Sequence, residues 1–204
     1  MTMPRRRLFL PLLALLLAGL AVPSAARAAL GPAAAQFIRT TGTALVGVIN
    51  GPGSADEKST AMEQIVDSRV DVDGIAKFCL GRFWRLATPA QRTQYQQLFH
   101  RVLVLNVTAK IGDYQGVRFT VGRATPRDEG VMVATIVNRP GQAPAEVDWL
   151  VREIDGTPRI IDVVAEGTSL RVTQRSDYAS FISRHDDSVA ALITALRAQA
   201  ARAG

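Results

Sequence analysis

The pattern of hydrophobic and polar positions predicts helices first, strands next and helices again at the end. Between residues 33 and 112, apolar residues recur every three or four positions, as on one face of an α-helix. Between residues 117 and 165 they alternate with polar residues, as in strands with one buried face. Helical spacing returns after Ser169. This order predicts a single α+β domain in which helices cover one face of a four-stranded antiparallel sheet.

One helix, predicted from Thr88 to Gly112, carries the clearest start signals. Thr88 suits the N-cap, Pro89 suits the first helical position, and Gln91 stands where a capping box requires it. The second half of this helix, residues 102–111, is apolar on nearly every side. A helix of this kind must be covered on more than one face. It therefore either runs through the middle of a core or lines an apolar cavity.

Shorter elements are expected on both sides of this helix, separated by turns rich in Gly, Pro, Asn and Asp. Helices are expected at about residues 33–50, 54–68 and 74–82, within 170–182, and from about 186 onward. Strands are expected at about residues 117–122, 131–137, 146–152 and 159–165.

Residues 1–28 are expected to be a signal peptide that is removed on export, which leaves one domain over residues 29–204. The arginines Arg5–Arg7 precede the apolar run Leu8–Val22, and small residues offer a cleavage site after Ala28. The run is short for a helix that crosses a bilayer, and an uncleaved N-terminal anchor is the alternative. The arginines also resemble the twin-arginine export motif, so the export route stays open.

The net charge changes once this leader is removed. The chain has 24 basic and 18 acidic residues, for a formal charge of +6. The leader carries four of the basic residues and no acidic residue, so about +2 remains. A charge this small gives no indication of nucleic-acid binding.

Candidates for catalysis are few. The sequence has no metal-ligand spacing, no glycine-rich phosphate loop and no nucleophile elbow. Asp162 and Glu166 lie four apart on a predicted strand and are an acid–base candidate, although such carboxylates are more often solvated or paired with arginine. Cys79, the only cysteine, lies in an apolar stretch and is expected to be a small buried residue. Neither His100 nor His185 sits in a recognisable motif.

Three segments carry motifs in matching order and spacing. Leu80–Arg92 (LGRFWRLATPAQR) resembles an "LG…W…A-S/T-P-x-Q-R" segment, and Lys110–Phe119, with Tyr114-Gln115-Gly116, resembles an "L-x-x-Y-x-G" segment at the end of the central helix. Ile160–Leu170 (IIDVVAEGTSL) is similar to a segment "hydrophobic-x-D-hydrophobic-x-x-E-G-hydrophobic-S-L", and Arg175 and Tyr178 follow it as in "R-x-x-F/W". These are segments of the Mla-type periplasmic phospholipid-binding proteins, or toluene-tolerance family, which the chain resembles over most of residues 33–200.

The resemblance implies a lipid shuttle in the periplasm, with phospholipid as cargo and with no cofactor and no metal. It implies a fold of the nuclear-transport-factor type, in which helices and a curved sheet enclose acyl chains in an apolar cavity. The expected partners are an inner-membrane ABC transporter complex with a lipid-binding periplasmic ring and an outer-membrane lipoprotein–porin complex. The chain is expected to be a monomer and not an enzyme, and to help maintain outer-membrane lipid asymmetry.

The chain departs from the family at Leu105-Asn106-Val107, where members often have Arg-Thr-Tyr, and at Pro158-Arg159, where a tryptophan is common. The first departure lies in the expected cavity wall, so the choice between phospholipid and hopanoid, the cargo of a related branch, stays open. Two other hypotheses also stay open: an enzyme on a similar cone-shaped fold, and a periplasmic interaction module with a solid core.

The candidate lipid contacts are apolar residues from the helices and from the covered face of the sheet. They are Phe83, Leu98, Val102, Leu105, Phe119, Val121, Val133, Trp149 and Val163. Glu166, Gly167 and Ser169 are expected to be structural: Gly167 allows a turn and Ser169 caps the helix that follows.

Overall fold

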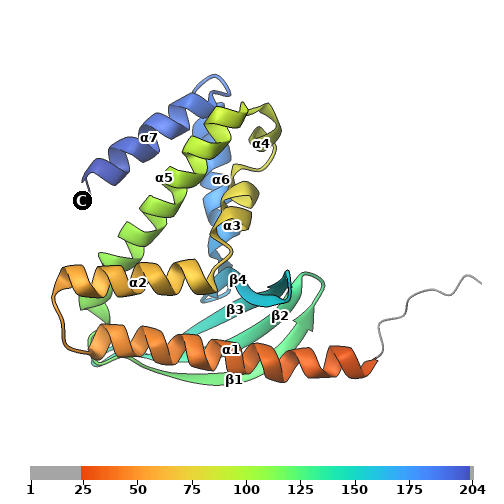
Figure 1. Cartoon of the computed structure of the whole chain (residues 1–204), viewed down its shortest axis with the longest axis vertical. Helices are drawn as coiled ribbons and strands as arrows, with labels where there is room; N and C mark the ends of the chain where they lie inside the picture. The colour runs from red at the N-terminus through yellow and green to blue at the C-terminus, as the bar shows by residue number, and fades with distance from the viewer. Residues whose placement is uncertain (1–23, 203–204) are drawn as a thin grey trace, which may run out of the picture.

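Helices lie on both sides of the strands in sequence, as predicted, over residues 24–202, the part of the chain that the computed structural model describes (Figure 1). The predicted signal peptide lies outside the described residues up to residue 23. Its last five residues begin the first helix. The described helices are α1 (Ser24–Asn50), α2 (Ala55–Arg69), α3 (Val72–Leu80), α4 (Phe83–Leu86), α5 (Pro89–Thr108), α6 (Leu170–Ser183) and α7 (Val189–Arg202), with a 3₁₀ turn, η1 (Ile111–Tyr114).

The strands form one antiparallel sheet in which each strand pairs with its neighbour in sequence. They are β1 (Arg118–Arg127), β2 (Gly130–Asn138), β3 (Ala145–Ile154), β4 (Thr157–Ala165) and β5 (Thr168–Ser169). The prediction of four strands was therefore wrong by one. The fifth strand turns back on the end of β4 and pairs Val164 with Ser169. A strand of two residues is too short to show an alternating pattern.

The helix starts follow the capping signals in the sequence. Thr88 and Gln91 form a complete capping box at the start of α5, and Ser54 and Glu57 form another at the start of α2. The end of α5 was predicted too late: the helix stops at Thr108, before Gly112. The Thr108 hydroxyl donates to carbonyls of the preceding turn, and the chain then tightens into η1. Such 3₁₀ turns commonly satisfy the last carbonyls of a helix.

Helix α1 covers one face of the sheet (Figure 1). Inward residues of neighbouring strands stand opposite one another, as Val133 does to Trp149. They pack against α1 in what we call the sheet cluster, whose buried members are Ala34, Phe37, Ile38, Val131, Val133, Val151 and Ile160. The start of α6 lies on the opposite face at β4, where Asp162 contacts it. Helices therefore reach both faces of this strand, and not one face only.

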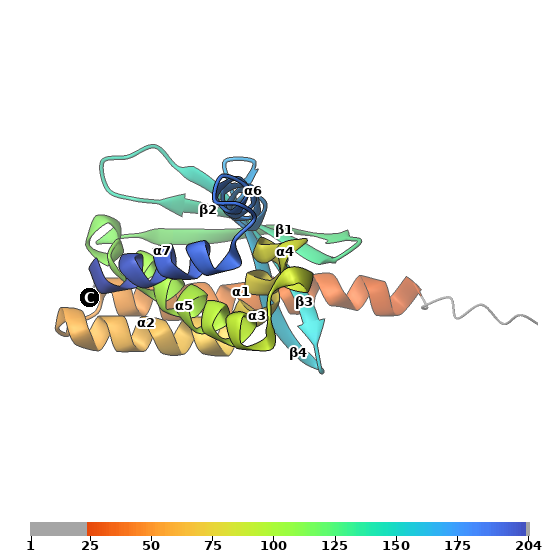
Figure 2. The same cartoon turned by 90° about the horizontal axis from the view of Figure 1, so that it is seen from above.

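The remaining helices form a second core, the helical cluster, built from α2–α7. Helices α5 and α7 lie side by side in both views (Figures 1 and 2). The rings of Tyr95, Phe99 and Tyr178 meet at the centre, at centroid distances of 5.9 to 6.4 Å. The Tyr95 hydroxyl donates to the Ala76 carbonyl at 2.9 Å, so this buried polar group is satisfied. No helix within residues 24–202 is long and apolar enough to cross a membrane.

The two clusters meet at the end of α2. Val70 packs against both clusters and forms a bridge with Ile160 of β4. The Asp71 amide donates to the Ile160 carbonyl at 2.9 Å, and Arg159 donates to the Asp67 carbonyl at 2.8 Å. These contacts fasten the end of α2 to the sheet.

Candidate functional site

The nine predicted lipid contacts do not form one continuous surface in the structure. Phe83, Leu98, Val102 and Leu105 belong to or pack against the helical cluster. Four others belong to or pack against the sheet cluster: Val121, Val133, Trp149 and Val163. Phe119 belongs to neither cluster.

Burial separates the nine residues further. Phe83, Val102 and Val133 are 1%, 6% and 0% exposed, and each lies inside a packed cluster. Side chains enclosed in this way have no free surface to offer a ligand unless the cluster opens. The other six are partly buried and keep some accessible surface.

Partly buried apolar side chains outside both clusters include six, from α1, α5 and the strands, that we call the apolar band. Phe119 and Val137 stand opposite each other on β1 and β2, on the sheet face that α1 covers, and Val147 lies on the same face of β3. The C-terminal half of α1 and the last turn of α5 complete the set. The apolar band is Leu45, Val48, Val107, Phe119, Val137 and Val147.

Only Phe119 of this band was among the predicted contacts. The signal for Val137 and Val147 was present, because both continue the alternation that selected Val133 and Trp149. Leu45 and Val48 lie in the helix predicted at residues 33–50, for which the sequence predicts no lipid contact. Sequence spacing gives the face of each element but not how far that face is covered.

Glycine and asparagine residues hold α1 against the sheet beside the apolar band. A Cβ atom at Gly42 would overlap the ring of Phe119, so the absence of a side chain there allows the ring to lie on α1. The Asn50 side chain donates to the Val117 carbonyl at 3.0 Å and accepts from the Gly116 amide at 2.8 Å. These two bonds fasten the end of α1 to the start of β1.

Asp162 holds the corner between β4 and α6. One carboxylate oxygen accepts from the amides of Val163 and Arg171 at 2.8 and 3.2 Å, and the other accepts from the Ser169 hydroxyl at 2.6 Å. The Arg171 side chain forms an ion pair with the same carboxylate. The carboxylate is 5% exposed and has no room for a substrate.

The structure contradicts the acid–base pair considered for Asp162 and Glu166. Glu166 lies in the turn after β4 with a φ of 50° and is exposed, whereas Asp162 is buried. The structural roles expected of Gly167 and Ser169 are confirmed. Gly167 has a φ of 79°, and the Ser169 hydroxyl accepts from the Val172 amide at 3.2 Å as the N-cap of α6.

Cys79 is buried, as predicted. Its side chain is 1% exposed, and its sulfur donates to the Arg171 carbonyl at 3.5 Å. Burial, and next the charge of Asp162, raise the pKa of the thiol to about 12. The thiolate that nucleophilic chemistry needs is therefore scarce at neutral pH.

An open groove of about 440 Å³ lies between α6 and α7, away from the predicted contacts. Its lining mixes polar residues such as Gln174 and Asp177 of α6 with apolar ones such as Leu192 of α7, and none of the nine predicted residues lines it. Asn106, which the sequence places in an apolar stretch, is exposed on α5 and needs no buried partner.

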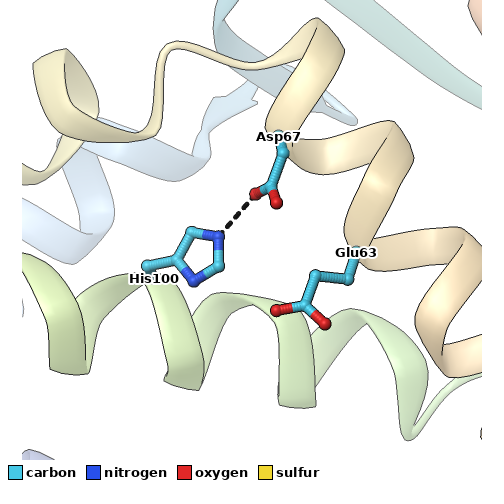
Figure 3. A group of neighbouring side chains, drawn as sticks. All are labelled: Glu63, Asp67 and His100. Carbon is cyan, nitrogen blue, oxygen red and sulfur yellow. Dashed lines mark hydrogen bonds and ion pairs between the residues drawn. The ribbon is translucent and has the colours of Figure 1, made fainter.

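Within residues 24–202, Glu63 and Asp67 of α2 and His100 of α5 lie close enough together to hold a metal ion (Figure 3). Their ligand atoms lie within 4.8 Å of one another. The sequence indicated no metal site because its third member comes from a separate helix. The recognisable part was a Glu-x-x-x-Asp spacing on one helix face.

The chain is similar to a known protein family and to solved structures. The family model described as "MlaC protein" matches residues 39–198. A solved structure of a phospholipid-binding protein from Ralstonia solanacearum, in complex with a phospholipid, is 23% identical to this chain. It matches with a TM-score of 0.72 over 83% of this chain and 98% of that one. At this identity the likeness shows a common fold.

Proposed function

The chain belongs to the MlaC family, and from this premise we propose that it is a periplasmic lipid carrier that binds phospholipid and shuttles it between the outer and inner membranes. Removal of residues 1–28 on export leaves residues 29–204 as one lipid-binding domain. The cargo is phospholipid and no cofactor is needed. The protein's fold is of the nuclear-transport-factor type, with the acyl chains in an apolar cavity and the headgroup near the surface.

The observation that carries this proposal is the apolar band. Its side chains come from α1, α5 and three strands, and they are buried only in part. A globular protein gains most when such side chains are fully packed. Apolar surface left beside two well-packed clusters suits a ligand that completes its burial. We place the acyl chains along this band, between the C-terminal half of α1 and the sheet.

The energetics explain why a carrier without catalytic groups is useful. Each buried CH₂ group is worth about 0.8 kcal/mol, so the two acyl chains of a phospholipid resist transfer into water by roughly 20 kcal/mol. A carrier with an apolar interior removes this barrier without covalent chemistry. The engaged carboxylate of Asp162 and the high thiol pKa of Cys79 favour binding over catalysis.

The proposed partners follow from the route. The carrier exchanges lipid with an inner-membrane ABC transporter complex, which presents a lipid-binding periplasmic ring, and with an outer-membrane lipoprotein–porin complex. It acts as a monomer. Hopanoid is the second candidate cargo, because Leu105, Asn106 and Val107 of α5, the last of them in the apolar band, differ from the common family pattern.

Lipid extraction tests the proposal directly. Mature protein purified without detergent is extracted, and the extract is analysed by mass spectrometry. We expect co-purified glycerophospholipid at about one molecule per protein, and a hopanoid spectrum would support the second cargo. Protein that carries no lipid, and accepts none from phospholipid vesicles, would contradict the carrier proposal.

A further inference from the structure

Glu63, Asp67 and His100 form a compact set of potential metal ligands where α2 packs on α5 (Figure 3). Glu63 and Asp67 lie four residues apart, so one helix face presents both carboxylates. His100 approaches from α5, with its Nε2 atom 2.6 Å from an Asp67 oxygen. One nitrogen and two carboxylate groups therefore converge from two helices.

The charges of this set lack a fixed counterion. Among residues 24–202, no lysine or arginine side chain forms an ion pair with Glu63 or Asp67. Arg159 lies close, but it donates to the main-chain carbonyl of Asp67 and not to the carboxylate. Like charges four apart on a helix repel each other, and His100 opposes them only when it is protonated. A bound divalent cation would remove this repulsion.

We propose that Glu63, Asp67 and His100 bind a divalent transition-metal ion, with zinc as the best fit. Zinc takes imidazole nitrogen and carboxylate oxygen at about 2.0–2.2 Å, commonly with three protein ligands and one water. Ligand atoms around such an ion lie roughly 3.4 Å apart, which small rotations of these three side chains reach from their present spacing. The imidazole disfavours magnesium and calcium, which prefer oxygen ligands alone.

The site goes beyond lipid carriage and does not depend on it. Its ligands lie at the solvent-exposed edge of the contact between α2 and α5: Glu63 and Asp67 are exposed and His100 is partly buried. None of the three belongs to the sheet cluster, the helical cluster or the apolar band. A bound ion would tie α2 to α5 by direct bonds and would leave the apolar band unchanged.

The chain offers a matched control for a binding experiment because it has only two histidines. His185, the other one, stacks on Phe181 far along the sequence from α2 and α5. Tag-free mature protein is titrated with zinc chloride by isothermal titration calorimetry. We expect one zinc per chain, a dissociation constant at least about tenfold weaker in His100→Ala, and an unchanged constant in His185→Ala. Loss of even an outer-shell partner costs about 10–100-fold in metal affinity, so a direct ligand should cost no less.

Glu63→Gln is the second variant, because Glu63 is exposed and its replacement leaves the packing intact even if His100→Ala impairs folding. It should also weaken zinc binding, and cobalt(II) added to the wild type should show visible absorption bands that both variants lose. Millimolar magnesium or calcium should not displace zinc. The proposal is overturned if the wild type binds no zinc, if His100→Ala and Glu63→Gln bind it as tightly as the wild type, or if His185→Ala loses it equally.

Discussion

The helical cluster and the layer formed by α1 and the sheet use apolar residues in different ways. In the helical cluster, Ala76, Tyr95 and Ile182 are fully buried, and the Tyr95 hydroxyl has its partner. In the α1–sheet layer, Val133 is buried as completely, but Phe119, Val137 and Val147 are only partly buried. The helical cluster is fully packed, whereas the α1–sheet layer is fully packed only beside the N-terminal half of α1. Stability and binding should therefore be separable by mutation.

The largest effect is expected from opening the closed region. Phe83→Ala removes an aromatic ring that is 1% exposed inside the helical cluster, and it should lower the free energy of unfolding by about 3–5 kcal/mol. Urea denaturation followed by circular dichroism measures the change. Phe119→Ala is the matched control in the apolar band and should cost clearly less, since its ring is only partly buried. Equal losses would remove the distinction between the two regions.

Adding volume should separate the two regions in the opposite sense. Val102→Trp overfills the helical cluster and should cost about 1–3 kcal/mol, because its neighbours have no room to move. Val147→Trp places the same ring in the apolar band and should leave unfolding nearly unchanged while uptake of fluorescent phospholipid from vesicles falls. Normal uptake by Val147→Trp would show that lipid binds elsewhere.

A smaller effect is expected at the corner that joins the two regions. Ser169→Ala removes both the N-cap of α6 and a hydrogen bond to Asp162, and should destabilise the protein by about 0.5–2 kcal/mol. Lipid uptake should persist in the folded fraction. Ser180→Ala, at an exposed site on the same helix, serves as control. Stability equal to that control would mean that the remaining bonds of Asp162, to Val163 and Arg171, hold the corner without Ser169.

The smallest effect should appear in alkaline solution. The unfolded chain ionises Cys79 near the usual pKa of 9.0, whereas burial raises the pKa to about 12 in the folded protein. The thiol's contribution is therefore complete below pH 9 and is lost as the pH rises toward 12. Burial raises the pKa of Tyr95 and Tyr178 as well, so the test is the difference between the wild type and Cys79→Ala at pH 8 and pH 10. An equal stability difference at the two pH values would show that folding does not raise the pKa of the Cys79 thiol.

Local chemistry made the helix starts and the main strands predictable. Thr88 with Gln91 is a capping box that acts within four residues, and the alternation of Val131, Val133 and Thr135 reports one buried face directly. The family match and the structural corner at Ser169 likewise rest on adjacent residues. Such features are encoded locally, so a sequence pattern reveals them.

The sequence could not predict which side chains are fully buried, because burial depends on how far one element covers another. Val102 and Leu105 have the same spacing signal on α5, but Val102 is buried inside the helical cluster, whereas Leu105 is only partly buried against it. The contact between Gly42 and Phe119 and the meeting of His100 with Asp67 join segments far apart in the chain. Periodicity names a face, whereas burial is set by tertiary packing.

The strand order has a consequence for how the chain folds. Each strand pairs with its sequence neighbour, so the sheet can form from hairpins whose ends are already close. The helical cluster, in contrast, joins α5, which ends at Thr108, to α6, which begins at Leu170. The helical cluster can pack only after the end of α5 and the start of α6 come close together, and the folded sheet between them brings them close. Gly156 lies in the β3–β4 turn with a φ of 74°, so its replacement should slow formation of that hairpin. We therefore expect it also to slow packing of the helical cluster, although that cluster contains no strand residue.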